Sequence, residues 1–494
     1  MRANYVQYNS PQFRLLSDKQ IEELHFATLQ ILERTGVAFE CQEAIEILGD
    51  AGADVSNPDR VKIPSNLVEQ ALRTTPKTIT LYTREGELAM VLNGQTGCHF
   101  GAQPDGYEYL DPYLRKPRQC YVRDVADAVR VVDALPNVEW VMMSGAHTTV
   151  PPSIADLVST LQAILNTSKP VCVPSFNDVQ NTKEMFRLCS IVAGGEEQLR
   201  RKPFLVSSAE PVSPLVHGKG PSELSLFCAE KGIPNIVYGM PMAGTTAPAT
   251  WAGCLAIANA EVLSQWVVLQ LRHPGAPLIF GSLPGIMDMK TTIFADGAPE
   301  VSLLVAALTE LGHYYKVPVF GTGGMTDAYI IGAQAAAEVT YSILVSKLSG
   351  ADFVHDIGIT YHDTCVSPEL MVLANEIIDM VDILIGGIEI NNETLPLDLI
   401  ERLGPRSNYL TEAHTRKHFR RFWAPALFDR SFARKEGVKD CEDLVNERTI
   451  EIIETHQPKS LPEDVVKELR KAEKTWFERE GLKCEYPKRA QGKQ

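Results

Sequence analysis

The residues best suited to chemistry follow a series of short apolar runs between positions 277 and 362. The runs are rich in Val, Ile and Phe and end in Gly or Ser, and polar side chains come after them: Asp288, Lys290, Thr322, Asp327, Asp356, Tyr361 and His362. Such runs are typical of parallel strands buried on both faces. In a closed parallel barrel, the loops at the carboxyl ends of the strands build the active site. We therefore expect the chemistry in these loops.

Metal and nucleophile chemistry find little support in the sequence. Zinc is held by clusters of Cys and His, and the short-range candidates are only His355 with His362 and His362 with Cys365. The chain has no G-x-S-x-G turn, and Ser207 and Ser208 have no assignable base. The sequence predicts no metal site and no acid/base catalyst, with His355 hydrogen-bonded inside a barrel mouth.

Aromatic and sulfur side chains recur at or just past the expected strand ends, with few acids and almost no lysine. The set comprises Phe100, Tyr107, Tyr109, Phe176, Tyr238, Met240, Met242, Phe280, Met287, Met289, Met325 and Tyr361. Such residues line apolar pockets, and aromatic faces hold quaternary ammonium ions by cation–π attraction. For any single residue, core or loop packing is the plainer interpretation. The substrate contacts that we expect from this set are Phe100, Tyr107, Phe176, Tyr238, Phe280 and Tyr361.

Glycines gather at the ends of the sixth to eighth expected strands: Gly281, Gly285, Gly321, Gly323, Gly324 and Gly358. Backbone N–H groups of most of them could hold phosphate, as barrel loops often do. The same glycines could leave room for the close approach of a large partner. The sequence does not separate these alternatives.

Eight apolar strand cores alternate with helical segments from residue 97 onward, which predicts a (β/α)₈ barrel. The expected strands are Cys98–Gly101, Trp140–Ser144, Val171–Ser175, Phe204–Ser208, Ile236–Met240, Leu278–Ser282, Val317–Thr322 and Phe353–Gly358. The expected helices are Val122–Ala134, Ile154–Leu165, Asn181–Val192, Glu223–Lys231, Trp251–Leu271, Pro299–Tyr315 and Gln334–Leu348. An open doubly wound sheet would need a phosphate-binding glycine fingerprint after its first strand, and none is present. An extra hairpin is expected within the first unit.

The barrel is flanked by two additional regions. We divide the chain into a helical and hairpin cap (1–95), the catalytic barrel (96–390) and a helical extension (391–494). In the cap, Ser17 and Gln20 are expected to form a capping box. Apolar and polar residues alternate over residues 77–94, as in the strands of an antiparallel hairpin.

Composition narrows the possible partners. The formal net charge of -15 argues against nucleic acid or an anionic membrane surface. No stretch approaches the ~18 uncharged apolar residues of a membrane span, and the first residues lack the apolar core of a signal peptide. Ten scattered cysteines without a C-x-x-C pair indicate reduced core thiols. We expect a cytoplasmic protein.

Several longer segments resemble the trimethylamine:corrinoid methyltransferase family, and more closely its branch without pyrrolysine, typified by glycine betaine:corrinoid methyltransferase. They are LSDKQIEELHFATLQILERTGVAFECQEAIEILGDAGADV, VKIPSNLVEQALRTTPKTITLYTREGE, GSLPGIMDMKTTIFADGAPE, GTGGMTDAYIIGAQAAAE, ILIGGIEINNETLPLDLI and NYLTEAHTRKHFRRFWAP. Together they span about residues 15 to 475. Each segment is only moderately specific, but the set is specific.

The resemblance implies a barrel that moves a methyl group from a methylated amine to Co(I) of a separate corrinoid protein. Where relatives that use trimethylamine have PDAQAGYE, this chain has IIGAQAAAE, and it shows only standard residues. That departure favours a quaternary amine, with glycine betaine as the best candidate. For a betaine carboxylate, the implied donors are His355, Tyr361, His362 and the N–H groups of residues 321–324. The six glycines above would face the corrinoid.

A quaternary ammonium already has a neutral tertiary amine as its leaving group, so no general acid is needed. Catalysis then consists of holding the N–CH₃ bond in line and excluding water. Two alternatives stay open: a barrel lyase or aldolase using Lys290, and a non-enzymatic betaine-binding protein. A homo-oligomer is compatible with the sequence. The sequence does not identify which quaternary amine is the substrate.

Overall fold

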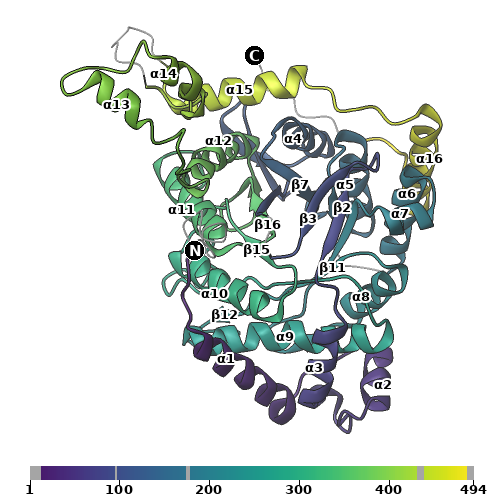
Figure 1. The fold of residues 1–494 in the computed structure, drawn as a ribbon. Coiled ribbons are helices and arrows are strands. Elements are labelled where there is room, and N and C mark those ends of the chain that lie inside the picture. The colour runs from purple at the N-terminus through teal and green to yellow at the C-terminus, as the bar shows by residue number, and fades with distance from the viewer. Residues whose placement is uncertain (1–12, 95–96, 174–178, 431–438, 487–494) are drawn as a thin grey trace.

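The computed structural model describes residues 13–94, 97–173, 179–430 and 439–486. Its centre is a sheet of eight parallel strands (Figure 1): β4 (His99–Ala102), β7 (Val138–Met142), β8 (Val171–Val173), β9 (Leu205–Ala209), β11 (Asn235–Val237), β13 (Leu278–Phe280), β15 (Phe320–Thr322) and β16 (Phe353–Ile357). A parallel bridge from Phe280 to Val319 joins the two edges, so the sheet closes on itself. The predicted (β/α)₈ barrel and its eight strands are confirmed.

Helices cover the outside of the barrel (Figure 1). They are α4 (Val122–Ala134), α5 (Pro152–Asn166), α6 (Val179–Ala193), the short α7 (Glu196–Arg201), α8 (Lys219–Lys231), α9 (Trp251–Arg272), α10 (Pro299–Tyr315), α11 (Ala333–Ser349) and α12 (Pro368–Ile385). Every expected helix is present, and α4 and α10 have the bounds that the sequence predicts. The expected hairpin in the first unit is β5 (Glu108–Asp111) paired with β6 (Lys116–Gln119). Short strands in the loops add β10 (Val216–His217), β12 (Met242–Ala243), β14 (Gly285–Ile286), β17 (Ile359–Thr360) and β18 (Cys365–Val366).

By length and composition alone, helix α9 is long and apolar enough to cross a membrane, although Glu261 interrupts its uncharged residues. However, 83% of its most apolar window is buried inside the protein. Trp266 and Leu269 are fully covered by neighbouring elements. Burial within a barrel layer identifies α9 as a core helix.

The amino-terminal cap packs against the barrel on two sides. Helices α1 (Asp18–Gln30), α2 (Gln42–Asp50) and α3 (Ser65–Thr74) share one apolar cluster with α9 and α10. Ser17 and Gln20 do form a capping box at the start of α1. The hairpin of β2 (Ile79–Tyr82) and β3 (Leu88–Leu92) buries Leu81 and Leu92 with Trp140 and Ile236 of the barrel interior. Because Tyr82 N donates to the carbonyl of Pro203, two residues before β9, the hairpin closes the amino-terminal end of the barrel.

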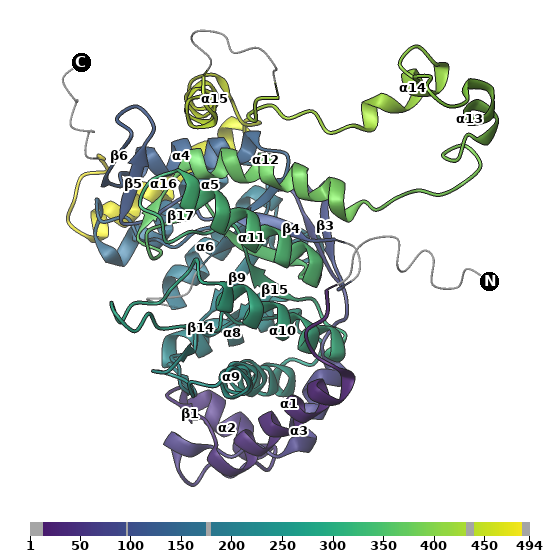
Figure 2. The ribbon, with the colours of Figure 1, turned by 90° about the vertical axis from the view of Figure 1, so that its left-hand side faces the viewer.

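The carboxyl-terminal region leaves the barrel and returns to it. After α12, an arm carrying α13 (Leu397–Leu403), α14 (Ala413–His418) and the 3₁₀ turn Phe419–Arg421 projects away from the body (Figure 2). None of these three helical segments contains a buried residue. Helices α15 (Cys441–Thr455) and α16 (Glu463–Arg479) then pack Val445 and Trp476 into the same apolar cluster as α4 and α5.

Candidate active site

A cavity of about 140 Å³ lies at the carboxyl ends of the barrel strands. A void of ~10–15 Å³ holds one water, so the cavity accepts a small molecule of several non-hydrogen atoms. Its lining comprises Gln103, Met142, Met143, Ser144, Glu210, Tyr238, Met240, Leu283, Phe294, Asp296, Val301, Met325, His355, Asp356, Ile359 and Asp363. Four of these side chains are carboxylates and none is Lys or Arg. The expectation of few acids at the barrel mouth is wrong.

Glu210 and Tyr238 form one wall of the cavity. The Tyr238 hydroxyl donates a short hydrogen bond to Glu210 Oε1. Burial raises the pKa of Glu210 above its ordinary value, and the hydrogen bond from Tyr238 opposes that rise. Burial and the neighbouring Glu210 charge raise the pKa of Tyr238 well above its ordinary value, so this phenol stays protonated.

His355 and Asp356, at the end of β16, form the cavity wall beside Tyr238. His355 Nδ1 lies 2.6 Å from Asp356 Oδ1, at an angle that makes the contact electrostatic and not a hydrogen bond. The Thr322 hydroxyl donates a short bond to Asp356 Oδ2. The imidazole stacks on Phe320 with 4.6 Å between ring centroids. Contrary to the sequence expectation, neither ring nitrogen of His355 has a hydrogen-bond partner in the part of the chain that the structure describes.

Asp296, Asp327 and His362 come together from three different loops. One ligand atom of each lies within 4.8 Å of the other two, and His362 Nδ1 lies 3.1 Å from Asp327 Oδ1. Two carboxylates and an imidazole could hold a divalent cation, and sequence spacing gave no sign of this group. Both oxygens of Asp327 already accept backbone N–H bonds, from Asp296 and Gly297.

Asp363 sits in a strained loop after β16. Asp356 has a φ of 88°, and the consecutive residues Tyr361, His362 and Asp363 have φ values of 51°, 56° and 56°. Left-handed conformations of non-glycine residues persist where surrounding structure enforces them, often at functional sites. Asp363 faces the open mouth yet lies deep among protein atoms, and this burial, with the charges of Asp356 and Glu210, raises its pKa to about 7.

The structure brings only part of the expected substrate set to the cavity. Tyr238 and His355 line it, together with Met240 and Met325. A ring nitrogen of His362 lies within 4.8 Å of a carboxylate oxygen of Asp296, which lines the cavity. The other residues lie elsewhere. Phe100 and Phe280 are buried against the surrounding helices, Tyr107 and Tyr361 are exposed, and Phe176 falls outside the described residues.

The six glycines expected to face a corrinoid are all buried. An added Cβ would come within 2.4 Å of Phe320 O at Gly281, 2.7 Å of Ser346 Oγ at Gly323 and 2.5 Å of Met371 Cε at Gly358. At Gly285 and Gly324 it would overlap Phe294 and Ile357, and at Gly321 it would lie 3.1 Å from Ala351 Cβ. Internal packing therefore accounts for these glycines without a partner, and the corrinoid-facing role stays a prediction.

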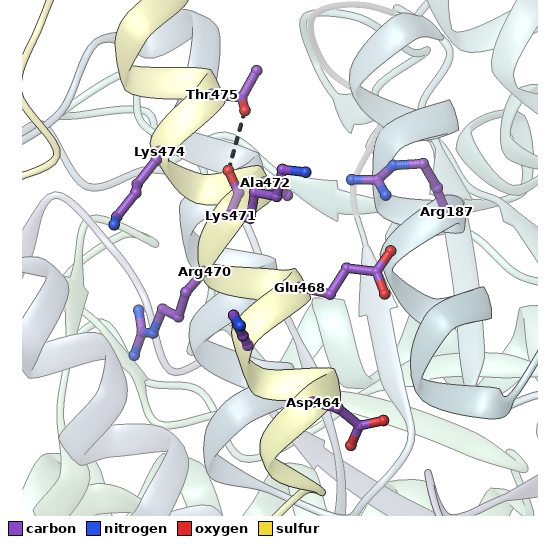
Figure 3. A pocket seen from close by; sticks show the side chains of 9 residues that line it. Arg187, Asp464, Glu468, Arg470, Lys471, Ala472, Lys474 and Thr475 are labelled. Carbon is purple, nitrogen blue, oxygen red and sulfur yellow. Dashed lines mark hydrogen bonds between the residues drawn. The ribbon is translucent and has the colours of Figure 1, made fainter.

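A wider hollow of about 630 Å³ runs along α16, outside the barrel (Figure 3). Its walls are mostly charged side chains, among them Arg187, Glu468 and Arg470. Arg187 and Glu468 approach each other from the two sides. An open groove of solvated charges offers no enclosed volume, so the small barrel cavity is the better candidate for chemistry.

A closed barrel with a small acid-lined cavity at the carboxyl ends of its strands has the architecture of a barrel enzyme for a small ligand. Comparison with known proteins identifies the family. The model of the family described as trimethylamine methyltransferase (MTTB) matches residues 1–475. This chain belongs to that family and is a methyltransferase.

Two relatives from Desulfitobacterium hafniense illustrate the similarity. The trimethylamine methyltransferase MttB of strain DSM 10664 / DCB-2 is 35% identical over 460 residues, 92% of each chain. The glycine betaine methyltransferase of strain Y51 is 31% identical over 429 residues, 85% of this chain and 88% of that one. The crystal structure of the Methanosarcina barkeri monomethylamine methyltransferase (MtmB) covers 97% of this chain and 91% of its own, with a TM-score of 0.51 and 12% identity. At that identity, the likeness supports the fold alone.

Proposed function

We propose that this protein moves a methyl group from a quaternary amine to Co(I) of a corrinoid carried by a separate protein. The observation that carries the proposal is the cavity, where the described lining residues include four carboxylates and Tyr238 but no Lys or Arg. Carboxylates and an aromatic face stabilise an ammonium ion. The family and the names of the two relatives support methylated amines as the substrate class.

The chain's own residues would bind and orient the donor. The carboxylates hold the ammonium, while Met142, Met240 and Phe294 surround its methyl groups and exclude water. A Co(I) corrinoid supplies the nucleophile that accepts the methyl group. The C–N bond electrons stay on nitrogen and the product is a neutral tertiary amine, so no residue of this chain has to transfer a proton.

The rim of the cavity suits a protein that brings the corrinoid. Large apolar side chains stand exposed on the loops that line the cavity: Val212 (64% exposed), Met289 (80%), Ile330 (62%) and Tyr361 (42%). Exposed apolar surface of this extent is typical of interaction sites. A ring of such residues around the mouth would place an incoming cofactor over the cavity.

As a second partner we propose another copy of this chain, so that the protein forms a homo-oligomer. The arm between α12 and α15 exposes Ile388 (80%), Leu410 (79%) and Phe422 (75%), which a second copy could cover. Light scattering on the intact chain and on a chain with these three residues changed to Ser tests this. A monomeric intact chain would contradict the oligomer.

A spectroscopic screen tests the methyl transfer. Chemically reduced cobalamin is mixed with the protein and one amine at a time: glycine betaine, choline, tetramethylammonium or trimethylamine. We expect methylcobalamin with at least one quaternary amine and little with trimethylamine. Ligand binding without methylcobalamin would indicate a binding protein instead. Borohydride trapping on Lys290, which lies exposed in its loop, would indicate a lyase or aldolase.

A further inference from the structure

The backbone donors near the cavity that a betaine carboxylate could use are already engaged. Gly323 N donates to His355 O at 3.0 Å, Gly324 N to Ser342 Oγ at 3.0 Å, and Tyr361 N to Thr326 O at 3.1 Å. The backbone N–H groups expected to receive a substrate carboxylate therefore serve the fold. An unpaired carboxylate inside a protein is strongly disfavoured.

Several polar side chains of the cavity are committed in the same way. Tyr238 donates to Glu210, and the Ser144 hydroxyl donates to Asp105. Gln103 Nε2 lies 3.3 Å from both Asp105 O and Asp363 Oδ1. Among the described lining residues, His355 is the remaining basic group. Its ring nitrogens form no hydrogen bond, but Nδ1 lies 2.6 Å from Asp356 Oδ1, and this carboxylate competes for the ring with a substrate carboxylate. A substrate carboxylate would meet four acidic side chains and this one basic group, which Asp356 already approaches.

The cavity instead offers an acceptor that lacks a donor. Asp296 lines the cavity and is only 7% exposed, and its Oδ2 has no hydrogen-bond partner among the residues that the structure describes. Buried polar atoms are almost always paired, so an orphaned carboxylate oxygen points to a missing donor or cation.

We infer that the substrate is a methylated ammonium whose only charge is on its nitrogen, and that a betaine is a poor substrate. This inference rests on the proposed function and narrows it. Specificity would come from repulsion as well as attraction, because a carboxylate beside the ammonium meets the acids that bind the cation. The sequence expectation of glycine betaine, and the name of the 31% identical relative, would then not extend to this chain.

The test compares tetramethylammonium and choline with glycine betaine and carnitine on the intact protein, in buffer containing a chelator. Calorimetric binding and methylation of reduced cobalamin are both measured. We expect the cations without a carboxylate to bind and react at least ten times better, and the neutral choline isostere 3,3-dimethylbutan-1-ol not to compete. Equal or better binding of glycine betaine overturns the inference while leaving the proposed function intact. Binding with the expected preference but no methyl transfer to cobalamin overturns the proposed function instead.

Substitutions test whether the cavity causes the preference for cations without a carboxylate. Asp296→Asn keeps the shape of the side chain and removes its charge, so we expect at least fivefold weaker binding of tetramethylammonium and a smaller preference over glycine betaine. Asp50→Asn removes the same charge from an exposed position at the end of α2 and should leave the preference unchanged. If Asp296→Asn unfolds, Glu210→Gln replaces it. An unchanged preference in the folded cavity variant contradicts the inference.

Discussion

Asp327 holds Asp296 in place from the neighbouring loop. Its Oδ1 accepts a 3.0 Å hydrogen bond from the backbone N–H of Asp296, and its Oδ2 accepts a second from Gly297. The backbone N–H of Asp327 donates in turn to Glu338 Oε2 at 3.0 Å. This chain of contacts fixes the loop after β13, and with it the carboxylate that faces the cavity without a partner.

Replacing Asp327 should therefore loosen the cavity. Asp327→Ala leaves two loop N–H groups without their acceptor, at a cost of about 1.5–3 kcal/mol in the free energy of unfolding for bonds to a charged group. Amine binding should weaken as well, because Asp296 is no longer fixed. Asp327→Asn retains one amide oxygen and should recover part of both losses. Urea unfolding and calorimetry measure them, and an alanine variant that matches the unchanged protein in both would contradict the positioning role.

Amine binding should strengthen as pH rises through about 7. Burial, Asp356 and Glu210 raise the pKa of Asp363 to about 7, with Asp105 adding to the rise and Gln103 opposing it. Below that pH Asp363 is protonated and contributes little attraction; above it the carboxylate favours a bound cation. Calorimetry in buffers of different ionisation enthalpy should show proton release on binding near pH 6.5. Asp363→Asn should flatten the profile, and an unchanged profile in that variant would assign the titration to another group.

Methyl transfer to cobalamin should survive exhaustive chelation. The mechanism requires no metal in this chain, although Asp296, Asp327 and His362 could hold one. Activity is measured before and after dialysis against a chelator, beside a His362→Ala variant. If chelation abolishes activity, zinc restores it, and the His362→Ala variant loses that restoration, the three residues form a metal site and the metal-free account is wrong.

The exposed rim should matter for the partner protein but not for free cobalamin. Met289→Glu places a charge on a side chain that is 80% exposed, so folding should be unaffected while docking of an apolar surface is opposed. We expect the rate with a corrinoid protein to fall at least fivefold and the rate with free cobalamin to stay within twofold. Leu482→Glu, also exposed but far along the chain after α16, is the control. If the rate falls equally with the corrinoid protein and with free cobalamin, Met289 affects the cavity and not the docking of the partner.

The barrel could be predicted from the sequence because its signal is local. Each strand is a short apolar run and each helix an amphipathic or apolar segment of the right length, so the eight βα units follow one another along the chain. The long α9 was predicted within one residue of its observed end, and Glu261 interrupts what would otherwise be an uncharged run of span length.

The direction of individual side chains could not be predicted. In β13, Ile279 points into the barrel interior while Phe280 points out against α9 and α10. Strands of a parallel barrel are buried on both faces, so their sequence lacks the alternation that would distinguish inside from outside. That is why Phe100 and Phe280 were expected in the cavity and lie in the outer layer.

The acids of the cavity were missed for a different reason. Glu210, Asp296 and Asp363 stand in loops, where a carboxylate is normally solvated, and nothing in the neighbouring residues marks them as part of one cavity. Only closure of the barrel brings their loops to one place. A count of all acids within five residues of every expected strand end would have found Glu210 and Asp363 but not Asp296, which lies 14 residues past Ser282.

The most direct test of methyl transfer from a cationic amine to cobalt is the ratio of the two products in one reaction. The protein is mixed with chemically reduced cobalamin and excess choline, methylcobalamin is followed by absorbance, and the demethylated amine is measured by NMR. We predict that one dimethylaminoethanol forms for each methylcobalamin. Choline that is bound but stays intact, or a tertiary amine that forms without methylcobalamin, would contradict methyl transfer from a cationic amine to cobalt.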